Sequence, residues 1–398
     1  MKRAIITPTF SGHFCFIEKY LESFDRYLQD KEFAIYFVIN KSEKGDLFRI
    51  IKKYTEKLNI NVVFLEDIFH RYNIEESPEE ALRTYGRLSF QTLKKFYAAR
   101  YINADQWLFL DSETMLIKPT NFTELFDEYF ESPHFFISRI SDRAVGYKDG
   151  FTYEFLKAVD AVFGKEPEYW SIESYEWFYD KQIFDQMITD IGEPITIIRN
   201  YKLPGKFKNV EGILEALLYY QYILYNNKFN YNIYVIEDEL RRYLGEKPYK
   251  KLKKAFDKGP YSICGFLEVC SFYIDKSMAK GFTDFLNDHR IRILRIEDPK
   301  VNNANAQVEF VNNSGVICCP SSQHHIFGIN ANTKTRKQIL IKENKNYIKF
   351  KEHYRSFINP FKFVARWTVE PLLIIKYGIK LLLLKATTKN IINESEKW

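Results

Sequence analysis

The sequence predicts an α/β protein with a mainly parallel sheet flanked by helices and a C-terminal helical extension that associates with membranes. Over the first 110 residues, short segments rich in β-branched and aromatic residues alternate with longer segments of helical periodicity. This alternation is typical of parallel strands joined by crossover helices. The chain has 398 residues, 46% of them apolar and 17% aromatic, which excludes a mainly disordered protein.

The first half of the sheet follows from the pattern in chain order. The expected strands are residues 3–8, 33–40, 61–65 and 106–110. The expected helices between them are residues 16–28, 45–58 and 88–101. Open α/β sheets bind ligands beyond the carboxyl ends of their strands. The positions to consider are therefore residues 7–13, 40–42, 66–67 and 111–113.

Beyond residue 120 the pattern is looser. Strands are expected at residues 135–138 and 233–236, and helices at residues 211–225, 249–258 and 275–288. We divide the chain into a catalytic domain, residues 1–333, and a basic tail, residues 334–398. The catalytic domain comprises a nucleotide-binding part, about residues 1–120, and an acceptor part, about residues 121–333.

The net charge of +6 is unevenly distributed. Residues 334–398 hold 15 Lys and Arg against 5 Asp and Glu, a net charge of +10, which leaves residues 1–333 at −4. A nucleic-acid-binding protein would need a basic surface on its folded domain, so we expect no nucleic-acid partner.

The tail has the pattern of a helix in a membrane interface. Lys362, Arg366, Lys376 and Lys380 fall within about 80° of one helix face, and Trp367 and an apolar stretch at residues 381–384 accompany them. Such a helix suits an anionic membrane surface. The alternative is a helix packed on the body of the protein, with its lysines in water.

The remaining signals favour a cytoplasmic protein bound peripherally to the inner face of the cytoplasmic membrane. No uncharged apolar run is long enough to span a bilayer, and the apolar stretch before Pro8 is too short for a signal peptide. Five cysteines without a C-x-x-C pair indicate reduced thiols.

The sharpest motif is Trp-Leu-Phe-Leu-Asp-Ser-Glu at residues 107–113. Four apolar residues lead directly into Asp111 and Glu113, which places two carboxylates at the end of a buried strand. Carboxylate oxygens suit Mg²⁺ or Mn²⁺, which in turn can hold a diphosphate. The alternative is a polar turn. A second D-x-E, at Asp30 and Glu32, precedes a strand and is expected to be a solvated turn.

The motif and its surroundings resemble the GT-A glycosyltransferases, which use nucleotide sugars and carry an Asp-x-Asp-type motif. Residues 91–113 are similar to little-characterised bacterial transferase-like families that place a Gln-x-x-Lys helix before an apolar strand and the acidic motif. Residues 211–224 resemble the Glu-rich, Tyr-containing helix of these families. The resemblance covers roughly residues 1–240, with Glu113 in place of the second Asp.

The resemblance implies a nucleotide-sugar donor and a bound Mn²⁺ or Mg²⁺. The residues that it suggests for the donor are Thr7, Thr9, Arg83, Arg87, Gln91, Lys94 and Asp111. Those that it suggests for the metal are Asp111, Glu113 and one of His324 and His325. The alternatives are turn chemistry for the threonines, solvated helix positions for the basic residues, and hydrogen-bonded loop histidines. His13, at a strand end, is a further candidate near the nucleotide.

A general base is needed if the transfer inverts configuration. Glu215, Glu211 and Asp180 are the candidates, with solvated helix glutamates as the alternative for the first two. Asp180 is also a candidate for binding the acceptor. Four aromatic residues could stack on sugar rings or pack in the core: Trp170, Tyr175, Trp177 and Tyr179.

Together these features predict a metal-dependent glycosyltransferase that moves a sugar from a nucleotide-diphosphate donor to a bacterial surface glycan or glycolipid acceptor, such as lipopolysaccharide, lipooligosaccharide or capsule. The alternative is a non-catalytic, membrane-docking glycan-binding or scaffold protein with a degenerate transferase fold.

Overall fold

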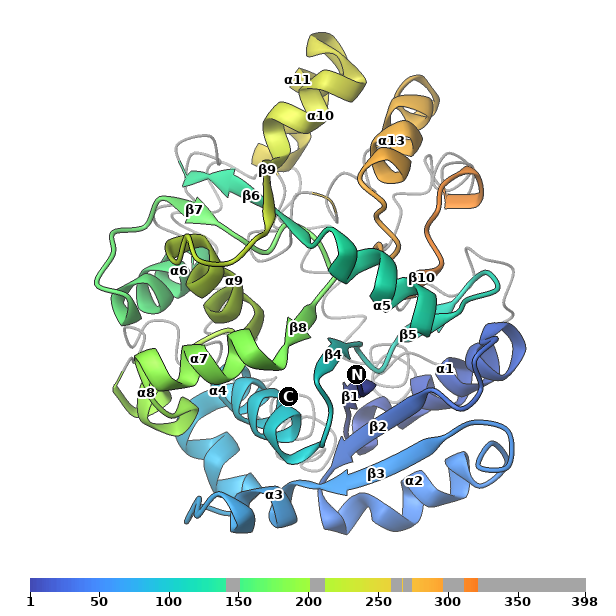
Figure 1. Cartoon of the computed structure of the whole chain (residues 1–398), viewed down its shortest axis with the longest axis vertical. Coiled ribbons are helices and arrows are strands. Elements are labelled where there is room, and N and C mark those ends of the chain that lie inside the picture. Colours follow the sequence, from blue (N-terminus) through green and yellow to red (C-terminus); the bar gives the residue numbers. More distant parts are fainter. Residues whose placement is uncertain (141–150, 201–211, 259–266, 268–273, 296–310, 321–398) are drawn as a thin grey trace, which may run out of the picture. The chain divides into compact units, whose positions relative to one another are not determined.

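The computed structural model describes residues 1–140, 151–200, 212–258, 267, 274–295 and 311–320 (Figure 1). All of them belong to one unit, Met1–Ala331. Within these residues no helix combines the length and apolarity needed to cross a membrane. The predicted amphipathic tail lies outside the described residues and stays a prediction.

The centre of the fold is a five-stranded sheet in the order β3-β2-β1-β4-β8. Four strands are parallel: β1 (Arg3–Pro8), β2 (Ala34–Ile39), β3 (Ile60–Phe64) and β4 (Gln106–Phe109). The edge strand β8 (Phe178–Asp180) runs antiparallel to β4. The predicted α/β class and the four predicted parallel strands are confirmed; β8 lies in the aromatic stretch that carried no strand prediction.

The helices of this half connect the parallel strands. After the short turns η1 (Ser11–His13) and η2 (Lys41–Glu43) come α1 (Phe14–Tyr27) and α2 (Lys44–Ile51). Helices α3 (Leu65–Arg71) and α4 (Pro78–Tyr101) join β3 to β4. Helix α2 ends seven residues before the predicted boundary, and α4 begins ten residues before it.

Helix α4 starts early because its first turn is capped by polar residues outside the apolar repeat. Ser77 accepts a hydrogen bond from the Glu80 backbone, the Glu80 carboxylate accepts one from the Ser77 backbone, and Pro78 occupies the first turn. Gly86 then breaks the helix with φ of 79°, a conformation that favours glycine. The predicted helix at residues 88–101 corresponds to the part after this break.

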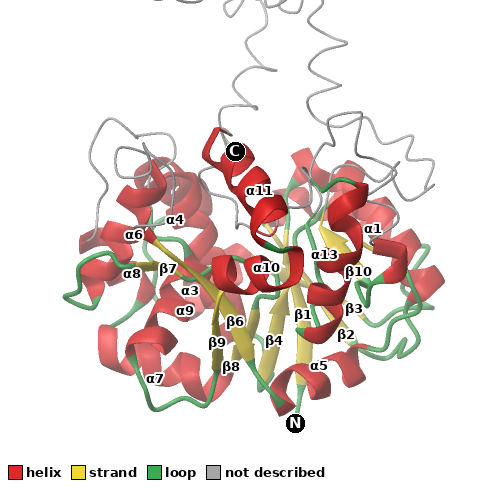
Figure 2. Ribbon diagram, turned by 90° about the horizontal axis from the view of Figure 1, so that it is seen from above, coloured by secondary structure: helices red, strands yellow, loops and turns green. Residues whose placement is uncertain are grey.

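Alternate residues of the central strands pack against opposite layers. Ile5, Leu108 and Leu110 belong to the core cluster under α1, α2 and α5 (Phe122–Glu131). On the other face, the rings of Trp107 and Phe184 have centroids 5.9 Å apart, and α4 packs on that face. Figure 2 shows the strands between α1 on one side and α4, α7 and α9 on the other. The continuous apolar run before Asp111 therefore reflects a strand buried on both faces.

The second half of the described chain adds smaller sheets and helices around a second core. β6 (His134–Arg139) pairs in parallel with β9 (Asn232–Val235) and antiparallel with β7 (Tyr169–Trp170), while β5 (Thr114–Leu116) pairs with β10 (Cys318–Pro320). The remaining helices are α6 (Phe151–Val162), α7 (Lys181–Ile191), α8 (Pro194–Asn200), α9 (Glu215–Tyr225), α10 (Ile236–Leu244), α11 (Glu246–Lys258) and α13 (Lys276–Asp288). Residues of β6, α10, α11 and α13 form the second core cluster.

The D-x-E at residues 30–32 is not the solvated turn that the sequence suggests. Asp30 is only 8% exposed, and its carboxylate accepts hydrogen bonds from the backbone amides of Phe122 and Thr123 at 3.1 and 2.8 Å. The Thr123 hydroxyl donates to it as well, at 2.9 Å. Asp30 therefore caps the start of α5 from 92 residues away in sequence.

We expect Asp30→Ala to lower the free energy of unfolding by about 1–3 kcal/mol, because it leaves buried amide donors at the start of α5 without an acceptor. Urea denaturation would measure the change. Glu32→Ala, at an exposed position two residues away, is the matched control and should stay within about 0.5 kcal/mol of the parent chain. Equal effects of the two substitutions would contradict the capping role.

Candidate active site

The topology places a crevice between the carboxyl ends of β1 and β4. From β1 the chain moves outward to β2 and β3, then returns to form β4 on the opposite side of β1. This change of direction is the topological switch point, where open α/β sheets bind their ligands. Residues 9–13 follow β1 there, and residues 111–113, here called the acidic motif, follow β4.

The acidic motif is held by polar contacts from two distant segments. The Asp111 carboxylate lies 3.5 Å from a guanidinium nitrogen of Arg295. The Ser112 hydroxyl lies 2.8 Å from His13 Nδ1, and Glu113 Oε2 lies 3.6 Å from the same nitrogen. Burial, together with the negative charge of Asp111, raises the pKa of Glu113. The two carboxylates are therefore close enough to repel one another.

Cationic side chains of α4 face the acidic motif from the second segment of that helix. Partial burial lowers the pKa of Arg87, while the charges of Glu113 and Asp111 act in the opposite direction. Lys95 lies about two turns further into the helix and interacts with the same two carboxylates. With Arg295, these residues set three positive charges around two negative ones, an arrangement suited to an additional anion.

Lys95 also forms a buried ion pair with Glu215, the first residue of α9. The two side chains are 7% and 1% exposed, and the Thr92 hydroxyl lies 3.2 Å from the other Glu215 oxygen. Burial lowers the pKa of Lys95, but the carboxylates around it outweigh that effect and the net shift is upward. Glu215 is thus neither a solvated helix glutamate nor open to an acceptor, and its contacts indicate that it positions Lys95.

An aromatic pair adjoins the acidic motif. The partly exposed rings of Tyr175 and Trp177 stack with centroids 4.9 Å apart. Arg295 lies 5.1 Å above the Tyr175 ring, and Lys95 lies 4.6 Å above the Trp177 ring. These two rings therefore lie next to the cations that interact with the acidic motif. The other two predicted stacking residues are in the core: Trp170 and Tyr179 are both fully buried.

The residues predicted for the donor divide into two groups. At the end of β1, Thr9 is 1% exposed, its carbonyl accepts from Lys94 Nζ at 3.2 Å, and its hydroxyl has no hydrogen-bond partner among the described residues. Lys94 is buried, which lowers its pKa to about 8, so it is not the solvated lysine of the alternative interpretation. Gln91 is half-buried on the same helix.

The structure does not bring Thr7 and Arg83 to the acidic motif in the same way. The Thr7 hydroxyl lies 3.2 Å from the Tyr20 hydroxyl, in the core beneath α1. Arg83 is exposed on the first segment of α4, before the break at Gly86, and its charge acts on Glu80. Neither side chain belongs to the cluster around Asp111.

Asp180 is at the wrong end of the sheet to serve this crevice. In the antiparallel pairing of β8 with β4 it lies opposite Gln106, five residues before Asp111, a separation of about 16 Å along the strand. Its carboxylate accepts from the backbone amides of Gln182 and Ile183 and caps α7. The predictions for Glu211, His324 and His325 fall outside the described residues.

The donor set of the acidic motif fits a divalent cation that a substrate completes. In the part of the chain that the structure describes, no three His, Cys, Asp or Glu side chains lie together as a metal group. Asp111 and Glu113 supply two oxygen ligands whose mutual repulsion a cation would relieve. Mg²⁺ is commonly bound through one or two carboxylates plus substrate phosphates and water. Metal dependence stays a prediction.

Sequence reasoning missed Lys95 and Arg295. Lys95 directly follows Lys94, but nothing in the local pattern shows that its partner is Glu215, 120 residues away. Arg295 follows α13 and meets Asp111 only through the tertiary fold. His13, which the sequence indicates as a candidate near the nucleotide, lies against the motif.

No family model and no curated protein sequence matches the chain. Among solved structures, S. aureus TarS is 15% identical to this chain. The match covers 79% of this chain and 54% of the TarS chain, with a TM-score of 0.30. Mouse xyloside xylosyltransferase 1 is 9% identical. The match covers 65% of this chain and 94% of that protein, with a TM-score of 0.37. The glycosyltransferase GlyE of Streptococcus pneumoniae TIGR4 is 12% identical. The match covers 67% of this chain and 53% of the GlyE chain, with a TM-score of 0.31.

The chain thus spans about half the length of the TarS and GlyE chains. Likeness at these identities and TM-scores assigns no activity, so a function has to be argued from the residues of the crevice.

We expect Glu215→Gln to lower the free energy of unfolding by about 3–5 kcal/mol, because it leaves the Lys95 ammonium buried without its counter-charge. Urea denaturation would measure the loss. The double variant Lys95→Met with Glu215→Leu should recover much of it, since both charges leave the interior.

The matched control is Asp185→Asn, which breaks the exposed i,i+4 pair with Lys181. It should cost no more than about 0.5 kcal/mol. A loss for Glu215→Gln as small as that of the control would show that the buried pair does not hold α4 to α9.

Proposed function

We propose that this protein is a metal-dependent glycosyltransferase, which transfers a sugar from a nucleotide-diphosphate donor to an acceptor hydroxyl. The single observation that carries the proposal is the pair Asp111 and Glu113 at the switch point of a parallel sheet, with Arg87, Lys95 and Arg295 around it. Paired carboxylates among cations suit a metal–diphosphate group better than either a metal or an anion alone.

The chain's own residues then have separate tasks. Asp111 and Glu113 would hold the ion, which when bound neutralises charge on the departing diphosphate. Arg87 and Arg295 add positive charge beside the same oxygens, where a preorganised charge is most effective. His13 and Ser112 fix the orientation of the motif. The buried Thr9 hydroxyl offers a hydrogen bond to the nucleotide at the end of β1.

The rings of Tyr175 and Trp177 suit the sugar side of the reaction. Both residues are partly exposed and contact Arg295 and Lys95, so a sugar that contacts them would lie beside the diphosphate. We assign these two residues to the transferred sugar or to the acceptor.

For the acceptor we propose a bacterial surface glycan, lipopolysaccharide, lipooligosaccharide or capsule, met at the inner face of the cytoplasmic membrane. The support is the tail, with its net charge of +10 and its apolar residues, which matches an anionic membrane surface. A lipid-linked acceptor would be concentrated at the same surface.

We expect Asp111→Asn with Glu113→Gln to reduce Mn²⁺-dependent donor hydrolysis on the order of 100-fold or more, because both carboxylate ligands are lost. The donor would first be identified by thermal shift with UDP-, GDP- and CMP-sugars, each with and without Mn²⁺. Hydrolysis of that donor is then measured for the parent chain and the variant.

The control carries the same change of charge at Asp46→Asn and Glu56→Gln, two exposed positions in and after α2, and should keep the parent rate. A parent chain that binds no nucleotide sugar, or a motif variant that is as active as the control, would instead indicate a non-catalytic glycan-binding or scaffold protein.

We expect the tail to bring the protein to anionic liposomes. The full chain should sediment with vesicles containing phosphatidylglycerol, and a chain that ends at residue 355 should stay in the supernatant. Replacing Lys362, Arg366, Lys376 and Lys380 by glutamate in the full chain should have the same effect, since each basic residue near the surface contributes about 1 kcal/mol. Equal sedimentation of all three proteins would refute membrane association.

A further inference from the structure

Helix α11 carries a concentration of positive charge that no function described above uses. Its residues 247–254 include five lysines and no carboxylate. Residues 1–333 as a whole have a net charge of −4, so this helix differs in sign from the body to which it belongs. Because lysines on a helix are often no more than a solvated surface, their arrangement and their partners decide whether the helix has a further role.

The packing of α11 turns one set of its lysines outward. Tyr249 and Leu252 are 2% and 1% exposed and belong to the second core cluster, together with residues of α10 and α13. At 100° per residue, four exposed lysines fall within about 100° on the side of the helix opposite these two residues: Lys247, Lys250, Lys251 and Lys254. Lys253 is half-buried on a different side.

The first residue of α13 extends this surface. Lys276 is exposed, and its neighbour Asp275 accepts a hydrogen bond from Lys251 Nζ at 2.6 Å, which joins the two helices at this point. Figure 1 shows α10, α11 and α13 together at the top of the view, at the opposite end of this unit from α2 and α3. We call the five residues the lysine face: Lys247, Lys250, Lys251, Lys254 and Lys276.

Only part of the charge of the lysine face is balanced by carboxylates. Lys250 lies 3.0 Å from Glu246, and that carboxylate is shared with Arg241 at 3.2 Å. Lys251 is paired with Asp275. The other three lysines form no ion pair with any residue that the structure describes: Lys247, Lys254 and Lys276. The lysine face therefore presents an excess of positive charge to solvent.

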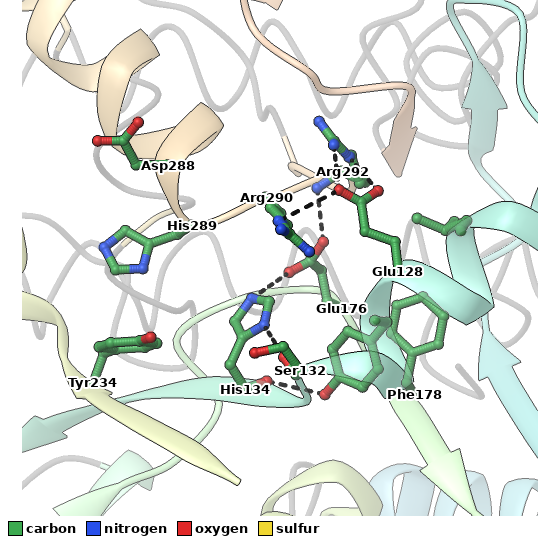
Figure 3. A pocket seen from close by; sticks show the side chains of 12 residues that line it. Glu128, Ser132, His134, Glu176, Phe178, Tyr234, Asp288, His289, Arg290 and Arg292 are labelled. Carbon is green, nitrogen blue, oxygen red and sulfur yellow. Dashed lines mark hydrogen bonds and ion pairs between the residues drawn. The ribbon is translucent and has the colours of Figure 1, made fainter.

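The arginines that follow α13 are balanced within the protein instead. Arg290 and Arg292 line a cavity of about 230 Å³ together with Glu128 (Figure 3). Arg292 donates through Nε to Glu128 at 3.0 Å, and Arg290 lies 3.9 Å from the same carboxylate. Arg290 also lies 3.8 Å from Glu131. Two arginines thus meet two glutamates, an arrangement that the lysine face does not have.

The chemistry of the lysine face suits an anionic lipid surface. Recognition of individual phosphates typically uses the planar fork of arginine, and α11 contains no arginine. Single-stranded nucleic acids are bound with aromatic rings beside the cations, but the ring of Tyr249 is buried in the core. Clusters of four to eight basic residues on an amphipathic helix are typical of binding to anionic headgroups.

We propose that the lysine face is a docking surface for an anionic membrane, which holds the folded body against lipid headgroups. The apolar side of α11 is occupied by the second core cluster, so the contact is electrostatic and does not insert into the bilayer. It is weaker than the contact proposed for the tail, which adds apolar burial, and the two act together. Because the body as a whole is negative, this face also sets the orientation of the bound protein.

Vesicle sedimentation with the full chain tests the proposal at an ionic strength of about 0.1 M, where the Debye length is about 10 Å. The test variant combines Lys247→Gln, Lys254→Gln and Lys276→Gln, and it breaks no ion pair among the described residues. We expect its apparent Kd for phosphatidylglycerol vesicles to rise at least about tenfold. Phosphatidylcholine vesicles carry no net charge, so the variant and the parent chain should bind them equally.

The matched control makes the same change of charge at three exposed lysines on separate elements: Lys52→Gln after α2, Lys157→Gln in α6 and Lys228→Gln before β9. Its Kd for phosphatidylglycerol vesicles should stay close to that of the parent chain. Donor hydrolysis in solution should be the same for all three proteins, because none of the substituted lysines belongs to the crevice.

Equal Kd values for the test variant and the control overturn the proposal, as does a parent chain that does not bind phosphatidylglycerol vesicles. A test variant that keeps its affinity for vesicles but loses affinity for a DNA or RNA duplex identifies a nucleic-acid partner and also overturns it. All three proteins carry the same tail, so failure of the tail prediction leaves this comparison intact. A parent chain without donor hydrolysis counts against the proposed function only.

Discussion

The arrangement of the crevice depends on one buried ammonium group, that of Lys95. It pairs with Glu215 of α9, lies over the Trp177 ring, and interacts with both carboxylates of the acidic motif. Four separate parts of the chain therefore meet at a single positive charge in the interior. Because an unpaired buried charge is costly, these parts are held to one relative arrangement. The positive charge of Lys95 also offsets the negative charge of Asp111 and Glu113 at the strand end, and the charges of Arg295 and Arg87 add to this effect.

The parallel half of the fold was predictable because its signals are local. A strand buried on both faces is a continuous apolar run, as at residues 106–110, so its position can be identified from the local sequence alone. The early start of α4 was not predictable from periodicity, since its capping box lies outside the apolar repeat. The short strand β8 was missed for a different reason: it is three residues long within an aromatic stretch, and only its pairing with β4 defines it.

In the candidate site too, features of the local sequence could be predicted and tertiary contacts could not. The acidic motif could be found from sequence because a strand and its carboxyl end are contiguous. The partners of the motif could not, since Arg295 lies far along the chain and its contact with Asp111 is purely tertiary. Neither interpretation of Glu215, a general base open to the acceptor or a solvated helix residue, anticipates its buried pair with Lys95, because only the fold brings the two side chains together. Asp180 fell at the opposite end of the sheet because β8 runs antiparallel, and sequence gives no direction to an isolated edge strand.

Residues 175–178 contribute both to the crevice and to the cavity lined by α5, the start of β6, β9 and the segment after α13. Tyr175 and Trp177 lie beside the cations of the crevice, whereas Glu176 and Phe178 line the cavity. The same holds at residues 292–295, where Arg292 belongs to the cavity wall and Arg295 to Asp111. Two short segments, residues 175–178 and residues 292–295, therefore contribute to both the crevice and the cavity. A substitution that shifts either backbone segment would therefore disturb both the crevice and the cavity.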